Sequence, residues 1–129
     1  MSFDAEEAKL EKARCLSEEV MPGLEEGLAK RYDDLLPGFS ESIVGMAWGD
    51  IYGRGGLDMK TRLLATIASL ATLGGQTKPQ LKIQIRAAQG QGATRREIAE
   101  VIMQMGLYGG FPAMINALNA ALEVFEEDG

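Results

Sequence analysis

The amino-acid sequence predicts an all-α fold, a compact bundle of six to seven helices in a single domain over residues 1–129. Apolar residues recur at helical spacings of three and four along most of the chain. Glycine and proline pairs divide it into segments of helical length, and helix-capping residues follow several of these breaks. No segment shows the alternating pattern that is typical of a half-buried strand.

Three helices are expected in the first half of the chain. The first should run from Asp4 to about Val20, the second over residues 25–35 and the third over residues 40–52. Proline-glycine pairs separate these helices, and the stretch GRGG ends the third. Residues 1–37 then form an N-terminal helical extension of the domain.

Capping residues place the helices of the second half. Asp58 can cap a helix that ends near Leu73. The stretches TKPQ at 77–80 and TRRE at 94–97 match the capping box, in which the Thr hydroxyl accepts from the third helical N–H and the Gln or Glu side chain reaches back. Pro112 suits the first turn of the last helix, where its missing N–H costs nothing.

The apolar positions predict which helix faces are buried. On the last two helices the expected buried residues are Ile98, Val101, Ile102, Met105, Tyr108, Met114, Ile115, Leu118, Ala121, Leu122 and Phe125. Small residues between them, such as those at 106, 109, 113, 117 and 120, allow close helix approach. Because the apolar arcs are wide, part of this surface is expected to lie between subunits of a homo-oligomer.

Composition excludes several functional classes. The net charge of −6 disfavours nucleic acid as a partner. Cys15 is the single cysteine, and no apolar run approaches the roughly 20 residues that span a bilayer, so we expect a cytoplasmic protein without a membrane partner. The chain has no histidine and no clustered acidic motif with ligand spacing, so neither a metal nor an organic cofactor is expected.

The charge is unevenly distributed. Eight of the thirteen basic residues lie between Arg54 and Arg96, where Asp58 is the single acid. One interpretation is that these residues form solvated helix faces with salt bridges to acidic parts of the chain. The other is a positive pocket for a small anion, the expected partner molecule. Both interpretations remain open from the residues alone.

Four motifs in order resemble the carboxymuconolactone decarboxylase family over roughly residues 40–125. They are the Trp-Gly pair at 48–49, RGGLDMKTR at 54–62, GATRREIAEV at 92–101 and YGGFPAMINA at 108–117. The resemblance implies the alkylhydroperoxidase D-like fold, an all-α domain that assembles as trimers or hexamers. It also implies a lyase of aromatic catabolism, in the protocatechuate pathway, that decarboxylates 4-carboxymuconolactone without a cofactor.

That reaction defines what a site needs. Loss of CO₂ from the γ carbon of the unsaturated lactone leaves a dienolate with charge on the lactone oxygen. Hydrogen-bond donors should therefore face that oxygen, cations should hold the substrate carboxylates, and an acid should protonate the α carbon.

The resemblance also marks a departure from the family. Its decarboxylases carry a histidine on the helix at 78–89, where this chain has Gln84. An amide donates a hydrogen bond but does not shuttle a proton. In the peroxidase branch of the fold, the two cysteines, the histidine and a glutamate correspond to Thr77, Gln80, Gln84 and Leu63. Thiol peroxidase activity is excluded because no thiolate is available there.

The resemblance leaves two functions open. In the first, a decarboxylase acts on a small carboxylated lactone: Arg54 and Arg62 hold its carboxylates, Trp48 contacts it, and Gln84 and Tyr108 donate to the oxyanion. In the second, the chain is a non-catalytic, oligomeric small-anion-binding protein on the same fold. For each residue a structural role also stands: an interface amide, a salt bridge from Arg62 to Asp50, or an aromatic core residue.

Overall fold

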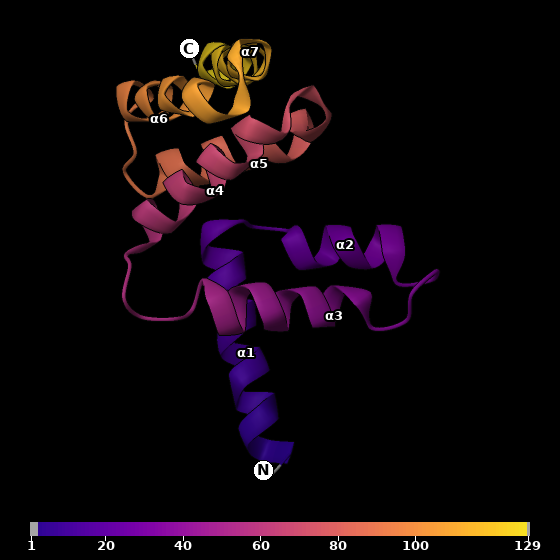
Figure 1. Ribbon diagram of the computed structural model, residues 1–129. Helices are drawn as coiled ribbons and strands as arrows, with labels where there is room; N and C mark the ends of the chain where they lie inside the picture. The colour runs from indigo at the N-terminus through magenta and orange to yellow at the C-terminus, as the bar shows by residue number, and fades with distance from the viewer. Residues whose placement is uncertain (1–2, 129) are drawn as a thin grey trace. The chain divides into compact units, whose positions relative to one another are not determined.

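The computed structural model of the protein describes residues 3–128. Backbone contacts divide the chain into two units, Met1–Leu57 and Asp58–Gly129. The described residues form seven α-helices, one π-helical segment and one 3₁₀ turn, and no strand occurs among them (Figure 1). The predicted all-α class is therefore confirmed.

The first unit is built from three helices. They are α1 (Phe3–Val20), α2 (Leu24–Tyr32) and α3 (Phe39–Ile43), and α3 continues into a π-helical segment, Val44–Ile51. The π-helical segment packs along α1, and α2 lies beside α3 (Figure 1). The three helices predicted for this part of the chain are present, with ends shifted by a few residues.

The π-helical winding is the feature of this unit that the sequence did not predict. The N–H of Tyr52 donates to the carbonyl of Ala47, five residues earlier, at 2.7 Å. Gly49 faces α1 there, since a Cβ on it would lie 3.5 Å from the Cβ of Ala13. Such segments of wider winding occur frequently at functional sites.

The second unit contains four helices. They are α4 (Met59–Leu73), α5 (Lys78–Gly90), α6 (Arg95–Gly109) and α7 (Phe111–Asp128), with a 3₁₀ turn at Gly75–Thr77 before α5. α4 packs on α5 and α6, and α7 packs on α5 and α6. All four correspond to predicted helices.

Two of the predicted caps are present. The Oδ1 atom of Asp58 accepts from the backbone N–H of Thr61 at 2.8 Å at the start of α4. At the start of α6, the Oγ1 atom of Thr94 accepts from the N–H of Glu97 at 3.0 Å, and the Glu97 carboxylate accepts from the N–H of Thr94 at 2.9 Å. The capping box at 94–97 is confirmed.

The capping box predicted at 77–80 is wrong. The hydroxyl of Thr77 donates to the carbonyls of Leu70 and Gly74, at 2.8 and 2.9 Å, and makes no cap hydrogen bond to α5. The reason lies in the backbone. Thr77 ends a 3₁₀ turn with φ −96° and ψ 9°, whereas a capping residue needs the extended backbone that Thr94 adopts. The hydroxyl instead ties the end of α4 to the start of α5.

The core of the second unit is formed by branched side chains of α4, α5 and α6. Leu63, Ile67, Ile85, Ile98 and Ile102 each have 0% exposed area. Small residues enable this packing, as predicted: a Cβ on the glycine at 109 would come 2.9 Å from the Cα of residue 72 in α4. One on the glycine at 106 would come 2.7 Å from the sulfur of residue 114 in α7.

The predicted buried face of α7 is partly wrong. Ile115 and Leu122 are 43% and 53% exposed, whereas Ala121 is buried as predicted. The other buried positions of α7 are Ala117, Ala120 and Val124. The small residues allow α7 to lie close to its neighbours, so the helix turns its larger side chains outward. Tyr108, also predicted to be buried, is 85% exposed.

Candidate functional site

Gln84 lies on α5 beside the stripe that packs into the second unit. Leu81, Ile85 and Ala88 of this stripe are buried, and Gln84 itself is half-buried. Its carboxamide oxygen is shielded from solvent, and no residue of the described chain donates a hydrogen bond to it. A buried acceptor without a donor is rare in a folded protein and calls for an explanation such as a ligand or water.

Two other candidate residues belong to the same unit. Arg62 lies one turn into α4 and is half-buried. Tyr108 lies at the end of α6, with 85% of its surface exposed. Its hydroxyl therefore has no shielded surroundings within one copy of the chain.

The remaining two candidates belong to the first unit. Arg54 is exposed in the loop after the π-helical segment. Trp48 is 2% exposed and stacks on Tyr52, with ring centroids 4.5 Å apart and planes 21° apart. This burial favours the core interpretation of Trp48, and its contact with substrate stays a prediction. Asp50, considered as a partner of Arg62, pairs with Lys9 at 2.5 Å.

Most of the basic segment forms salt bridges within the second unit. The pairs are Lys60–Glu97, Lys78–Glu123, Lys82–Glu127, Arg86–Glu127 and Arg96–Glu100, at 2.9, 2.7, 3.2, 2.6 and 2.7 Å. The interpretation as helix faces with salt bridges is confirmed for these residues. Four of these pairs connect α5 to α7 or α4 to α6, and Arg96–Glu100 lies within α6, so the charge of these cations is neutralised locally.

These pairs depress the pKa of the acids. Hydrogen bonds from Arg86 and then Lys82 lower the pKa of Glu127, and Lys78 lowers that of Glu123. A carboxylate whose pKa is lower in the folded chain releases its proton more readily there than in the unfolded chain. Its contribution to stability is complete above the unfolded pKa, about 4.3 for Glu, and is lost as the pH falls through the folded value.

Acidification is therefore expected to destabilise the second unit through these pairs. The melting temperature should fall as the pH is lowered from about 5 towards 3, where the carboxylates take up protons. Glu127→Gln should melt at a lower temperature at neutral pH and should show a shallower acid dependence, because two cations lose their partner. Glu126→Gln, which removes an exposed acid without an ion pair in the described chain, is the matched control. Parallel melting curves for the Glu127 and Glu126 variants would contradict this assignment.

An apolar surface lies where α6 passes into α7. Its five large side chains are 43–85% exposed, and we call them the α6–α7 patch: Met103, Leu107, Tyr108, Phe111 and Ile115. From residue 101 to residue 122 the chain contains no Asp, Glu, Lys or Arg. A surface with this much exposed apolar area marks an interaction site.

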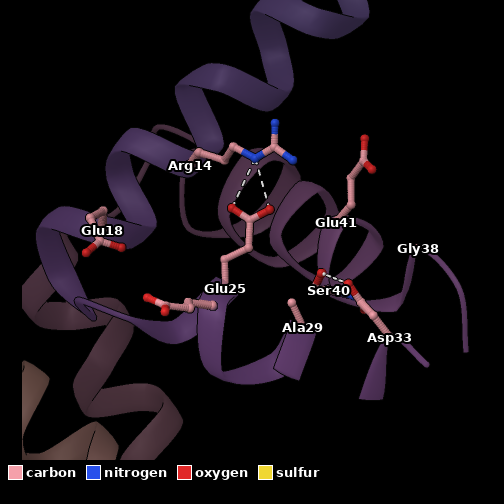
Figure 2. A pocket seen from close by; sticks show the side chains of 9 residues that line it. Arg14, Glu18, Glu25, Ala29, Asp33, Gly38, Ser40 and Glu41 are labelled. Carbon is pink, nitrogen blue, oxygen red and sulfur yellow. Dashed lines mark hydrogen bonds and ion pairs between the residues drawn. The ribbon is translucent and has the colours of Figure 1, made fainter. Parts of the chain in front are cut away.

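The first unit contains an acidic cavity of about 580 Å³ that the sequence did not indicate. The Nε atom of Arg14 donates to both carboxylate oxygens of Glu25, at 3.0 and 2.9 Å (Figure 2). Asp33 accepts from the N–H and the hydroxyl of Ser40, at 2.9 and 2.7 Å (Figure 2). Further acids, Glu18, Glu26 and Glu41, line the cavity. This surplus of negative charge disfavours a dicarboxylate ligand there.

Comparison with known proteins identifies the family. The profile described as the carboxymuconolactone decarboxylase family matches residues 37–123. The chain belongs to the carboxymuconolactone decarboxylase family. The match includes all five candidate residues and begins after α1 and α2 have ended.

Relatives of this carboxymuconolactone decarboxylase family protein include two enzymes named for decarboxylation. The 4-carboxymuconolactone decarboxylase of Acinetobacter baylyi is 38% identical over 75% of this chain and 71% of its own. Nitrosuccinic acid decarboxylase npaB of Metarhizium robertsii is 35% identical over 60% of this chain and 53% of its own. An uncharacterized 15.0 kDa protein of Paracoccus denitrificans is 42% identical over 83% of this chain and 80% of its own.

No group of three or more His, Cys, Asp or Glu side chains in the described part of this family member is arranged to hold a metal ion. Among the described helices, none combines the length and the apolar character required to cross a membrane.

Proposed function

We propose that the protein is a cofactor-free decarboxylase that acts on a small carboxylated lactone, 4-carboxymuconolactone being the first candidate. The observation that supports this most directly is the buried carboxamide oxygen of Gln84, which has no donor in the described chain. This oxygen can still accept a hydrogen bond, and it lies at the helix position where the family's decarboxylases carry their histidine. Relatives named for decarboxylation make that chemistry the leading candidate.

The proposed reaction needs stabilisation of negative charge more than acid strength. The bond between the γ carbon and its carboxylate breaks, CO₂ leaves, and the electron pair passes into a dienolate with charge on the lactone oxygen. The Nε2 group of Gln84 donates to that oxygen. The last torsion angle of a Gln side chain varies widely, so the amide can turn either its nitrogen or its oxygen toward the substrate. The carboxamide oxygen then accepts from a water molecule, which supplies the proton to the α carbon and is left as hydroxide that leaves with the products.

The arginines have a different role in this proposal. Arg62 holds a substrate carboxylate, for which the guanidinium group offers a bidentate fork. The same role for Arg54, which belongs to the first unit, stays a prediction from the sequence.

The α6–α7 patch completes the proposal as a contact between copies of this chain. We propose a homo-oligomer, a trimer or a hexamer, in which a second copy covers the patch. Tyr108 belongs to this patch and is 85% exposed, so its proposed role as a donor to the oxyanion requires that cover. The absence of charged residues from 101 to 122 removes the electrostatic cost of bringing two such surfaces together.

The second candidate function is a non-catalytic, oligomeric protein that binds a small anion. Lack of a titratable group at Gln84 favours it, since no histidine exists anywhere in the chain to supply a proton.

One experiment separates these functions. The purified protein is mixed with 4-carboxymuconolactone, and both its melting temperature and the loss of the lactone are followed. Consumption of the lactone with release of CO₂ supports the decarboxylase. A rise in melting temperature without product supports the binding protein, because a ligand that binds the folded state stabilises it. No change in either quantity contradicts both assignments for this compound.

A further inference from the structure

The first unit contains a second hollow, a groove of about 440 Å³ between α1 and the end of the π-helical segment. α1 contributes Lys12, Leu16 and Glu19 to its lining, and the opposite wall includes Trp48, Gly49 and Gly53. Apart from Trp48, for which contact with the substrate is predicted, no lining residue of this groove takes part in the proposed decarboxylation.

Two glycines form part of the far wall of the groove. A Cβ at Gly53 would come 2.6 Å from the carbonyl oxygen of Trp48, so the backbone leaves no room for a side chain at that position. A Cβ at Gly49 would make an ordinary contact of 3.5 Å with the Cβ of Ala13. Neither glycine carries a side chain that could cover the groove.

The charged residues of α1 make the two ends of the groove different. Lys9 already pairs with Asp50, whereas Lys12 makes no ion pair with any described residue. Glu19 lies seven residues further along the helix, about 10 Å from Lys12 along the axis. Leu16 lies between them. The groove therefore has a cationic end, an apolar middle and an anionic end.

We infer that this groove binds a small monocarboxylate with an apolar body. The carboxylate pairs with the ammonium group of Lys12, and the apolar body lies over Leu16 and the open backbone at Gly49. Glu19 repels a second carboxylate at the far end, so the groove discriminates against dicarboxylates. This selectivity distinguishes the groove from the proposed lactone site, whose substrate carries two carboxylates.

Cys15 supplies a reporter that requires no engineering. It is exposed, it lines the groove, and it is the single cysteine of the chain. A ligand in the groove must therefore slow the alkylation of Cys15. The rate constant for its reaction with iodoacetamide, followed by mass spectrometry of the intact protein, measures occupancy directly.

The probes are benzoate, its neutral analogue benzamide, and the dicarboxylate terephthalate. Benzoate at millimolar concentration is expected to slow alkylation of the wild-type protein, and benzamide and terephthalate should do so less. In Lys12→Gln, half-protection should require a roughly fivefold higher benzoate concentration, which corresponds to loss of one solvent-exposed ion pair. Lys30→Gln, an exposed lysine of α2 outside the groove, is the matched control and should behave as wild type.

Three results would overturn the inference. The first is an alkylation rate that benzoate does not change at any concentration up to its solubility. The second is equal protection of wild type and Lys12→Gln, and the third is equal protection by benzoate and terephthalate. Because the assay follows Cys15 and not turnover, a negative result leaves the proposed decarboxylation untouched.

Discussion

Gln84→Ala is expected to lower kcat for decarboxylation of 4-carboxymuconolactone by roughly 100- to 1,000-fold, the usual effect of removing one donor to an oxyanion. The carboxamide has no bond to the described protein through its oxygen, so its removal should not disturb the fold. An unchanged melting temperature together with lost turnover would separate the chemical role from a structural one. Steady-state kinetics and a melting curve on the same preparation measure both.

Gln80→Ala is the matched control for this experiment. Gln80 lies one turn earlier on α5 and is exposed, and it does not form the predicted capping box. The substitution should leave kcat unchanged. If Gln84→Ala also left kcat unchanged, Gln84 would be removed from the mechanism. If it unfolded the protein, its role would be structural.

Leu107→Asp is expected to dissociate the homo-oligomer into monomers of about 13.9 kDa. Leu107 is 79% exposed at the α6–α7 patch, and a buried, unpaired carboxylate at a subunit contact costs several kcal/mol (about 3–5). Light scattering coupled to size-exclusion chromatography measures the mass. Turnover should also be lower in the dissociated variant, because a second copy of the chain would no longer cover Tyr108.

Leu35→Asp supplies the matched control for assembly. Leu35 is 78% exposed, almost the same as Leu107, and lies in the first unit outside the α6–α7 patch. This substitution should leave the mass unchanged. A wild-type protein that is monomeric at micromolar concentration, or a Leu107→Asp variant that keeps the wild-type mass, would contradict the proposed interface.

Helix positions were predictable because their signals are local. Asp58 and Thr94 each cap a helix through atoms three residues away, so a short stretch of sequence contains both partners. Thr77 has the same local pattern and fails, because a 3₁₀ turn leaves its backbone outside the extended conformation. That turn depends on the packing of α4 against α5, and a short stretch of sequence does not reveal this packing.

Burial was less predictable than helix position. Ile115 and Tyr108 fit the periodicity of a buried stripe, yet both are exposed. Periodicity identifies an apolar face, but it does not show whether that face is buried by the same chain or by another copy of it. The small residues of α7, with Ala117 and Ala120 at its buried positions, decide which side turns inward.

The candidate site shows the same limit. A resemblance in sequence singled out Gln84, but only the structure revealed that its carboxamide oxygen is buried without a donor. The acidic cavity around Arg14 and Glu25 had no signal in the sequence, because its residues come from three helices and pair across eleven positions. Contacts of this range depend on the tertiary fold.

An amide at position 84 is expected to support decarboxylation without a histidine. The most direct test is the rate of ¹³CO₂ release from carboxyl-labelled 4-carboxymuconolactone by the purified wild-type protein, with Gln84→His measured beside it. Release by wild type at a rate that depends on enzyme concentration is the expected result. No release by wild type, with activity appearing in Gln84→His, would contradict the claim and would mean that the pocket has lost its acid.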